Sequence, residues 1–213
     1  MDKNVEWLNE KRIEKTIKAL ENNKINGYFV KNEDELIKTI EKIVAKDATV
    51  SCGGSMTLFE TGIIDYLRKG RYNFLDRYEK GLSAEDIKNI YRKSFFADAY
   101  FASTNAITEN GELYNVDGNG NRVAAMIYGP DKVIIIAGVN KIVKNEAEAV
   151  ERVKCIAAPA NAKRLNRDTP CSETGYCAYC SSPDRICSSY VTIRKQSQKG
   201  RIHVILLNKN LGY

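Results

Sequence analysis

The segment that most constrains the fold is KVIIIAGV at residues 132–139, an apolar and mostly β-branched run without alternating polar positions. A strand with one face in solvent alternates apolar and polar residues, whereas a strand covered on both faces is continuously apolar. Continuous runs of this kind are typical of parallel sheets that carry helices on both sides. We therefore expect this segment to be a central strand of an α/β fold.

The rest of the chain alternates strand and helix patterns. Apolar residues recur at helical spacing from Val5 to Leu20, and Asn32 with Glu35 is a typical start of a second helix. Ser83 opens another helix, and Asn110-Gly111 predicts a hairpin. Strands are predicted at residues 27–31, 48–52, 72–76 and 97–103.

The C-terminal third begins with a predicted helix over residues 145–162. The last strand patterns, residues 190–195 and 201–208, are expected to pair with each other around QSQKG. The whole pattern predicts one domain over residues 1–213, with a Rossmann-like, mainly parallel sheet flanked by helices and late antiparallel strands.

Charge and hydropathy narrow the functional class. The net charge is +6, but the 33 basic residues are interspersed with 27 acidic ones, which is typical of solvated helix faces and not of nucleic-acid binding. No apolar run approaches the ~20 residues that span a bilayer, and the first residues, MDKNVEWLNEKR, are charged. We expect a cytoplasmic protein without a membrane span.

A glycine turn, SCGGSMT at residues 51–57, joins a predicted strand to a helix. Glycines allow close backbone approach, and the N–H groups at a helix start suit a phosphate or carboxylate. Gly53, Gly54, Ser55 and Thr57 are therefore candidate anion-binding residues. The alternative is an ordinary tight turn with a serine cap.

A polar loop lies between two apolar strands, where open α/β sheets place their ligands. Its candidate ligand-binding residues are Thr104, Asn105, Asn115, Asp117, Asn121 and Arg122. Arg122 is the least explained by turn geometry, because a guanidinium can clamp an anion with two bonds. The alternative is that the Asn, Asp and Gly residues only satisfy turn conformations.

Four of the six cysteines lie within residues 169–189, at Cys171, Cys177, Cys180 and Cys187, with the spacing C-x5-C-x2-C-x6-C. Thiolates this dense in a reducing compartment predict a metal site. Only one C-x2-C pair is present, which favours a [4Fe-4S] cluster over a zinc ribbon, with zinc as the alternative.

The remaining cysteines and the single histidine are less informative. Cys52 and Cys155 are expected to be small buried residues, although the adjacent helix start would make Cys52 reactive if it lowered the thiol pKa. His203 lies in an apolar strand pattern and is expected to be packed. With one histidine in the chain, we expect no Ser-His-Asp or Cys-His catalysis.

The segments GGSMTLFETG, STNAITENGELYNVDGNGNRVAAMIYGPDKVIIIAGVNKIV and PCSETGYCAYCSSPDRIC together resemble the lactate-utilization (LUD) domain family, long catalogued as a domain of unknown function. The resemblance covers nearly the whole chain. It implies a fold similar to sugar-phosphate isomerases and coenzyme A transferases, with the glycine turn and the polar loop facing one another. It also implies participation in the oxidation of lactate to pyruvate alongside iron–sulfur partner proteins.

Three functions are compatible with these patterns. The first is a redox-pathway protein that binds a small anion, such as a 2-hydroxy acid, a 2-oxo acid or a phosphorylated compound, near an iron–sulfur cluster. The second is an isomerase-like or acyl-transferase-like enzyme with a structural zinc, using Glu60 or Glu109 as its acting carboxylate, with Glu112 also available. The third is a non-catalytic assembly subunit for iron–sulfur proteins.

Overall fold

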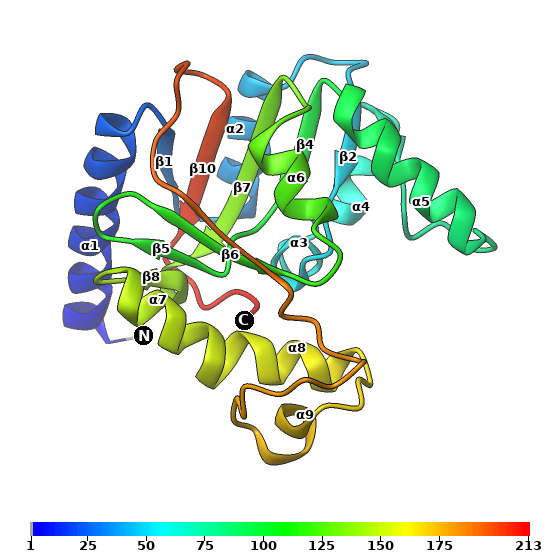
Figure 1. The fold of residues 1–213 in the computed structure, drawn as a ribbon. Coiled ribbons are helices and arrows are strands. Elements are labelled where there is room, and N and C mark those ends of the chain that lie inside the picture. The colour runs from blue at the N-terminus through cyan, green and yellow to red at the C-terminus, as the bar shows by residue number, and fades with distance from the viewer. Residues whose placement is uncertain (1) are drawn as a thin grey trace.

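The computed structural model describes residues 2–213 and contains a main sheet of six parallel strands (Figure 1). Residues 2–213 include no helix that is both long and apolar enough to cross a membrane. Across the main sheet the strands are β1 (Asn26–Val30), β10 (Ile202–Leu207), β7 (Lys132–Gly138), β4 (Ala99–Ala102), β2 (Thr49–Cys52) and β3 (Asn73–Leu75). The predicted Rossmann-like α/β class is confirmed.

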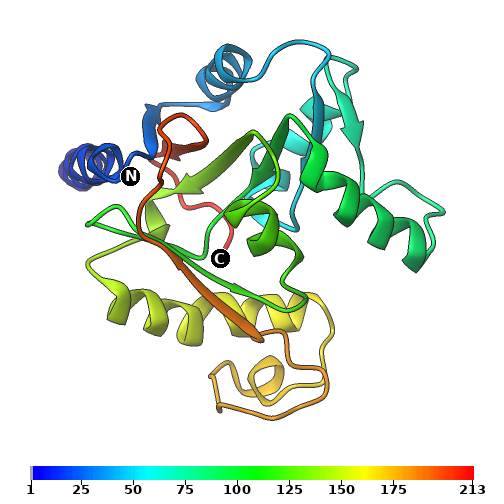
Figure 2. The same cartoon turned by 45° about the horizontal axis from the view of Figure 1, so that its top comes forward.

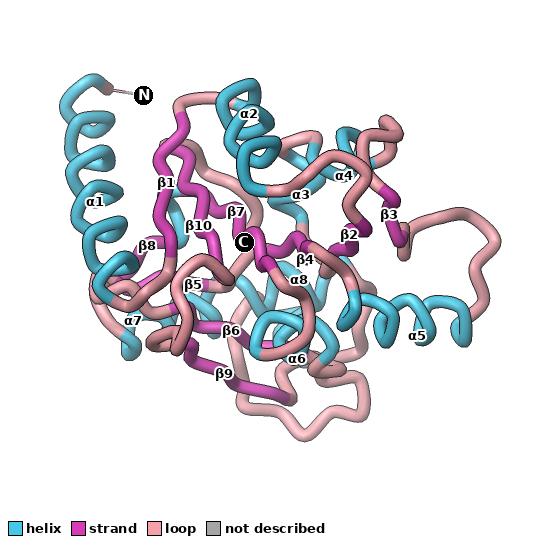
Figure 3. Tube along the Cα trace, turned by 90° about the horizontal axis from the view of Figure 1, so that it is seen from above, coloured by secondary structure: helices cyan, strands magenta, loops and turns pink. Residues whose placement is uncertain are grey.

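Both faces of the main sheet are buried, as the continuous apolar strand β7 predicts. Ile134 and Ile136 point into one core, which includes α2 (Glu33–Ile43), α3 (Met56–Glu60) and α4 (Ile63–Leu67). Val133 and Ile135 point into the opposite core, with α1 (Lys3–Asn22) and α6 (Asn121–Ile127). Seen from above, α2, α3 and α4 lie on one side of this sheet and a second, smaller sheet lies on the other (Figure 3).

The predicted helix starts form because side chains satisfy the free backbone N–H groups of the first turn. Asn32 accepts a hydrogen bond from the backbone N–H of Glu35 at 3.0 Å and begins α2. Ser83 and Asp86 form a reciprocal capping box at the start of α5 (Ala84–Lys93). The short helix η1 (Ser94–Phe96) then leads into β4.

The second sheet has the strand order β8 (Ile142–Val143), β5 (Ala106–Thr108), β6 (Leu113–Asp117) and β9 (Ser189–Ile193). The hairpin predicted at Asn110-Gly111 joins β5 to β6. Gly111 has φ +78°, and a Cβ there would lie 2.5 Å from the backbone of Ala19 in α1. Only glycine fits that position without displacing the helix.

The prediction that the last two strands pair with each other is wrong. β9 runs antiparallel to β6 in the second sheet, as a late antiparallel strand, whereas β10 lies parallel between β1 and β7 in the main sheet. All six residues of β10 are buried. A strand this apolar is stabilised most by a central position with both faces covered.

The predicted helix over residues 145–162 is interrupted. It consists of α7 (Glu146–Arg152), a π-helical turn η3 (Val153–Ala157) and α8 (Ala158–Arg164). Pro159 has no N–H to donate to the preceding turn, which favours an irregular hydrogen-bond pattern at this point. The π-turn exposes Cys155, so the expectation that Cys155 is buried is wrong. Figure 2 shows α7 and α8 along the second sheet, with α9 (Pro170–Thr174) beyond them.

Candidate functional site

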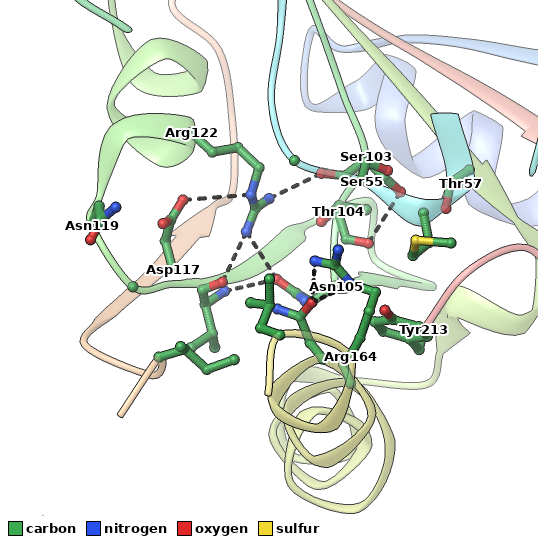
Figure 4. Close-up of a pocket in the computed structure, with 18 of the residues that line it drawn as sticks. Ser55, Thr57, Ser103, Thr104, Asn105, Asp117, Asn119, Arg122, Arg164 and Tyr213 are labelled. Atoms are coloured by element: carbon green, nitrogen blue, oxygen red, sulfur yellow. Dashed lines mark hydrogen bonds and ion pairs between the residues drawn. The ribbon is translucent and has the colours of Figure 1, made fainter. Parts of the chain in front are cut away.

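A polar cavity of about 350 Å³ lies at the carboxyl edge of the main sheet (Figure 4). Its walls come from segments that follow β2, β3, β4 and β7, and from the chain after β10. This is the edge at which open parallel sheets place their ligands. The β6–α6 loop and helix α8 close the cavity from the side of the second sheet.

The structure brings most of the predicted ligand-binding residues together. Those that line the polar cavity are Gly54, Ser55, Thr57, Thr104, Asn105, Asp117, Asn121 and Arg122. Gly53 and Asn115 stand behind this wall and support it. A Cβ on Gly53 would lie 3.0 Å from both Arg122 and Tyr100, and Asn115 is fully buried. Ligand binding by these residues stays a prediction.

The glycine turn ends β2 and begins α3. The Ser55 hydroxyl accepts a 3.4 Å hydrogen bond from the backbone N–H of Leu58, so it caps this five-residue helix. Gly54 is exposed at the mouth of the turn. A Cβ added to it would lie 3.7 Å from the guanidinium of Arg77. The turn thus combines a helix start, an accessible backbone and a nearby guanidinium, which together suit an anion.

Arg122 is held by the protein from all sides. Its Nη1 donates to the backbone oxygen of Ser103 at 3.0 Å and to Asn115 at 2.6 Å. Its Nη2 donates to Asn105 at 3.1 Å and to a backbone oxygen of β6, while Nε lies 3.5 Å from a carboxylate oxygen of Asp117. Burial lowers the Arg122 pKa, against the opposing effect of the Asp117 charge.

These bonds give Arg122 a role that the sequence did not suggest. An arginine has five N–H donors, and here they join the β4 end, the polar loop and α6 (Figure 4). Arg122 therefore fixes the shape of the cavity wall. Free donors for a ligand must come from other side chains.

Several cavity cations were missed by the sequence analysis. Arg77 follows β3, stacks on the rings of Tyr78 and Tyr91 at 5.3 and 4.7 Å, and has a buried Nε without a hydrogen-bond partner among residues 2–213. Arg164 ends α8 and Arg167 follows it, and both line the polar cavity with exposed side chains. The rule that ligands bind at strand ends would have found Arg77, because it stands two residues after β3.

The balance of charge in the polar cavity is strongly positive. Its basic lining residues are Arg77, Arg122, Lys141, Arg164 and Arg167, and Asp117 is the one acidic lining residue within the described chain. Asp117 is already paired with Arg122. The cavity therefore favours an anion.

The candidate catalytic glutamates lie elsewhere. Glu60, Glu109 and Glu112 are not among the cavity-lining residues of the described chain. Glu109 is paired with Lys15 at 2.6 Å, and Glu60 accepts a 2.6 Å hydrogen bond from the backbone N–H of Gly212. The structure gives none of them the position of a nucleophile in this cavity.

The four clustered cysteines line a second cavity, of about 50 Å³. Cys171, Cys177, Cys180 and Cys187 are each partly exposed, and Tyr114, Val150, Val153 and Ala158 contribute to the apolar lining. Burial raises the pKa of Cys187, and the charges of the other three thiols act in the same direction. The four cysteines therefore line the same cavity, and metal binding there stays a prediction.

Arg185 braces this cysteine cavity through the backbone. Its Nε donates to the backbone oxygen of Cys187 and its Nη1 to that of Cys180, both at 2.8 Å. On the other side, the Ser182 hydroxyl donates to the backbone oxygen of Asp168 at 2.6 Å. These bonds hold together the two ends of the cysteine segment.

The two cavities share a wall. Ala157 lines the polar cavity, and its neighbour Ala158 lines the cysteine cavity. In the same way, Ile186 faces the polar cavity and Cys187 faces the cysteine cavity. The π-turn η3 forms part of this wall, and π-turns occur frequently at functional sites.

Cys52 and His203 are structural. Burial raises the pKa of Cys52 to about 12, so this thiol is not activated by the start of α3. His203 is buried, with Nδ1 3.0 Å from the Tyr28 hydroxyl and Nε2 2.9 Å from the backbone oxygen of Gly200. The packed role predicted for His203 is confirmed.

The fold defines an α/β protein with its main cavity at the carboxyl edge of a parallel sheet. The family model described as LUD domain matches residues 13–207, so the chain belongs to the LUD domain family. It is a lactate-utilization-type protein in that general sense. A search of curated proteins finds no significant match.

A solved structure shares the fold of this chain. A DUF162 family protein from Deinococcus radiodurans has a TM-score of 0.53 at 13% identity, covering 93% of this chain and 98% of that one. This likeness shows a common fold. A ribose 5-phosphate isomerase from Plasmodium falciparum matches more distantly, with a TM-score of 0.32, 17% identity and coverage of 53% and 52%.

Proposed function

We propose that this chain is a redox protein of lactate utilization that binds a small anionic ligand beside an iron–sulfur cluster. The shared wall between the two cavities is the observation that carries this proposal. One cavity offers cations, and the other offers four thiols, the groups that bind iron–sulfur clusters. Ligand and cluster would be separated by single residues of η3, α8 and the cysteine segment.

The spacing of the cysteines in the sequence favours a cluster over a single zinc ion. Among residues 2–213, no three His, Cys, Asp or Glu side chains are placed to hold one metal ion. Tetrahedral zinc needs its four sulfurs about 2.3 Å from one point. The single C-x2-C pair is not the zinc-ribbon pattern, so Cys171, Cys177, Cys180 and Cys187 would hold a [4Fe-4S] cluster through their thiolates.

Cys171, Cys177, Cys180 and Cys187 would hold this cluster, with Arg185 positioning two of them. When bound, the cluster would supply a one-electron donor or acceptor. The chain's own residues would do the rest. Arg77 would bind the carboxylate or phosphate of the ligand, and Arg122 would keep the loop around it in place.

Spectroscopy of the anaerobically purified protein tests this function. We expect a brown sample that absorbs near 400 nm and bleaches with dithionite, as iron–sulfur proteins do. Adding lactate or pyruvate should change the electron paramagnetic resonance spectrum of the reduced cluster, because the ligand cavity adjoins it. Calorimetry gives the concentrations that saturate binding. If neither acid changes the spectrum at those concentrations, the ligand does not act on the cluster, and the proposed coupling of the two sites is wrong.

A dye-reduction assay separates the redox role from an assembly role. The isolated chain, with cluster bound, should reduce a dye in a lactate-dependent manner. Partners with their own iron–sulfur clusters would accept these electrons in the cell. Failure of the isolated chain to reduce the dye, with cluster and ligand both bound, would favour the assembly subunit.

A further inference from the structure

The polar cavity contains a buried amine that the proposed function does not use. Lys141 ends η2 (Val139–Lys141), directly after the central strand β7, and is only 3% exposed. Its Nζ donates to the backbone oxygens of Thr104 at 3.2 Å and Tyr213 at 3.1 Å. Among residues 2–213, no Asp or Glu side chain forms an ion pair with it.

The surroundings of Lys141 disfavour a positive charge. Burial is the main cause, and the guanidinium groups of Arg152 on α7 and Arg122 on α6 add repulsion. Glu60 on α3 is the charged group that acts in the opposite direction, and the nearby Tyr213 side chain has a raised pKa and is neutral. Together these groups lower the Lys141 pKa to about 7.

An unprotonated lysine is a nucleophile toward carbonyl groups, and burial beside other cations is a known way to activate one. Lys141 lines the same cavity as Arg77, which has an unpartnered Nε, and as the exposed backbone of Gly54. The cavity thus combines a nucleophile with groups that bind an anion. A 2-oxo acid carries both of the chemical groups that these residues recognise.

We propose that Lys141 condenses with the carbonyl group of a 2-oxo acid to form an imine. The lysine nitrogen forms a double bond to the carbonyl carbon and gives up its two protons, and the carbonyl oxygen gains two protons and leaves as water. No electron is gained or lost, and no further reactant is needed. The step rests on the proposed binding of an anionic ligand in this cavity, and it assigns the carbonyl-bearing acid as the ligand class.

Reductive trapping tests the imine. The protein is incubated with pyruvate and sodium borohydride, digested, and examined by mass spectrometry for a reduced pyruvate adduct. We expect the adduct at Lys141 in the native protein, with at least a tenfold loss of labelling in Lys141→Arg. Lys144→Arg is the matched control, because Lys144 is exposed three residues away, and it should label like the native protein.

The site of the adduct decides the outcome, even if Lys141→Arg folds poorly. Labelling of the native protein spread evenly over surface lysines, or absent, overturns the imine. Calorimetry with pyruvate alone distinguishes a failure of imine formation from a failure of the proposed anion binding. Pyruvate that binds without labelling Lys141 overturns the imine and leaves anion binding intact, whereas pyruvate that does not bind overturns both for this acid.

Discussion

The two cavities differ in what holds their walls in place. The polar cavity is built from the ends of several sheet strands and is fixed from within by buried hydrogen bonds, above all those of Arg122. The cysteine cavity is built largely from one surface segment whose cysteines are all partly exposed. The polar cavity is therefore shaped by the fold itself, whereas the cysteine cavity depends on local hydrogen bonds of one segment.

The largest expected effect is a loss of stability when Arg122, which holds the wall of the polar cavity, is replaced. Arg122→Ala would leave the Asp117 charge and several buried oxygens without their partner. We expect a loss of about 3–5 kcal/mol in the free energy of unfolding, measured in urea. A loss below about 1 kcal/mol would show that Arg122 is free to serve a ligand instead, as the sequence alone indicates.

Replacing Arg185 beside the cysteine cavity should weaken metal binding without destabilising the fold. Arg185→Ala removes the bonds to the backbone oxygens of Cys180 and Cys187. Residues that orient metal ligands typically contribute 10–100-fold in metal affinity, so we expect metal binding to weaken by about that much. The free energy of unfolding of the metal-free protein should change little, since Arg185 is exposed. Arg167→Ala, at another exposed arginine nearby, serves as the control.

Arg77 should differ from Arg122, because we expect it to bind the ligand and not to hold the cavity wall. Its guanidinium makes ring contacts and has no hydrogen bond or ion pair with the rest of the described chain. Arg77→Ala should weaken the binding of pyruvate or inorganic phosphate about tenfold, as expected for a lost charge-assisted bond. Calorimetry measures the affinity, and unchanged affinity for both anions would remove Arg77 from the site.

The last expected effect is a pH dependence that originates at Lys141. Its pKa is about 7 in the fold and about 10.4 in an unfolded chain. Between these values the unfolded state binds more protons, so the native protein gains stability as pH rises, by about 1.4 kcal/mol per pH unit. Below about pH 7 this contribution is constant.

Lys141→Met should lack that slope, because its side chain does not titrate. Urea unfolding at pH 7.5 and 9 measures the difference between the two proteins, with Lys144→Met as the exposed control. Parallel profiles for Lys141→Met and the native protein would mean that Lys141 stays protonated throughout.

The sequence predicts best what is determined locally. Short segments of sequence are enough to predict the apolar strand β7, the helix caps at Asn32 and Ser83, and the hairpin at Gly111. All of these predictions are confirmed. The four cysteines are predicted as a group, and they line one cavity. Metal binding by these cysteines stays a prediction.

What the sequence missed depends on contacts between distant segments. The partner of β10 is chosen by the whole sheet, so the apolar pattern at residues 201–208 alone does not distinguish a hairpin from a central strand. Arg77 and Lys141 enter the polar cavity only because β3 and β7 end at the same edge. Arg122 was recognised as unusual, but the partners that occupy its donors lie across the loop and were not predictable.

Iron analysis of the anaerobically reconstituted protein tests the central claim most directly. With Cys171, Cys177, Cys180 and Cys187 around one cluster, we expect about four irons per chain, and loss of that iron in Cys177→Ser but not in Cys155→Ser, whose thiol is exposed outside the cavity. One zinc per chain, no bound metal, or full retention of iron in Cys177→Ser would contradict the account.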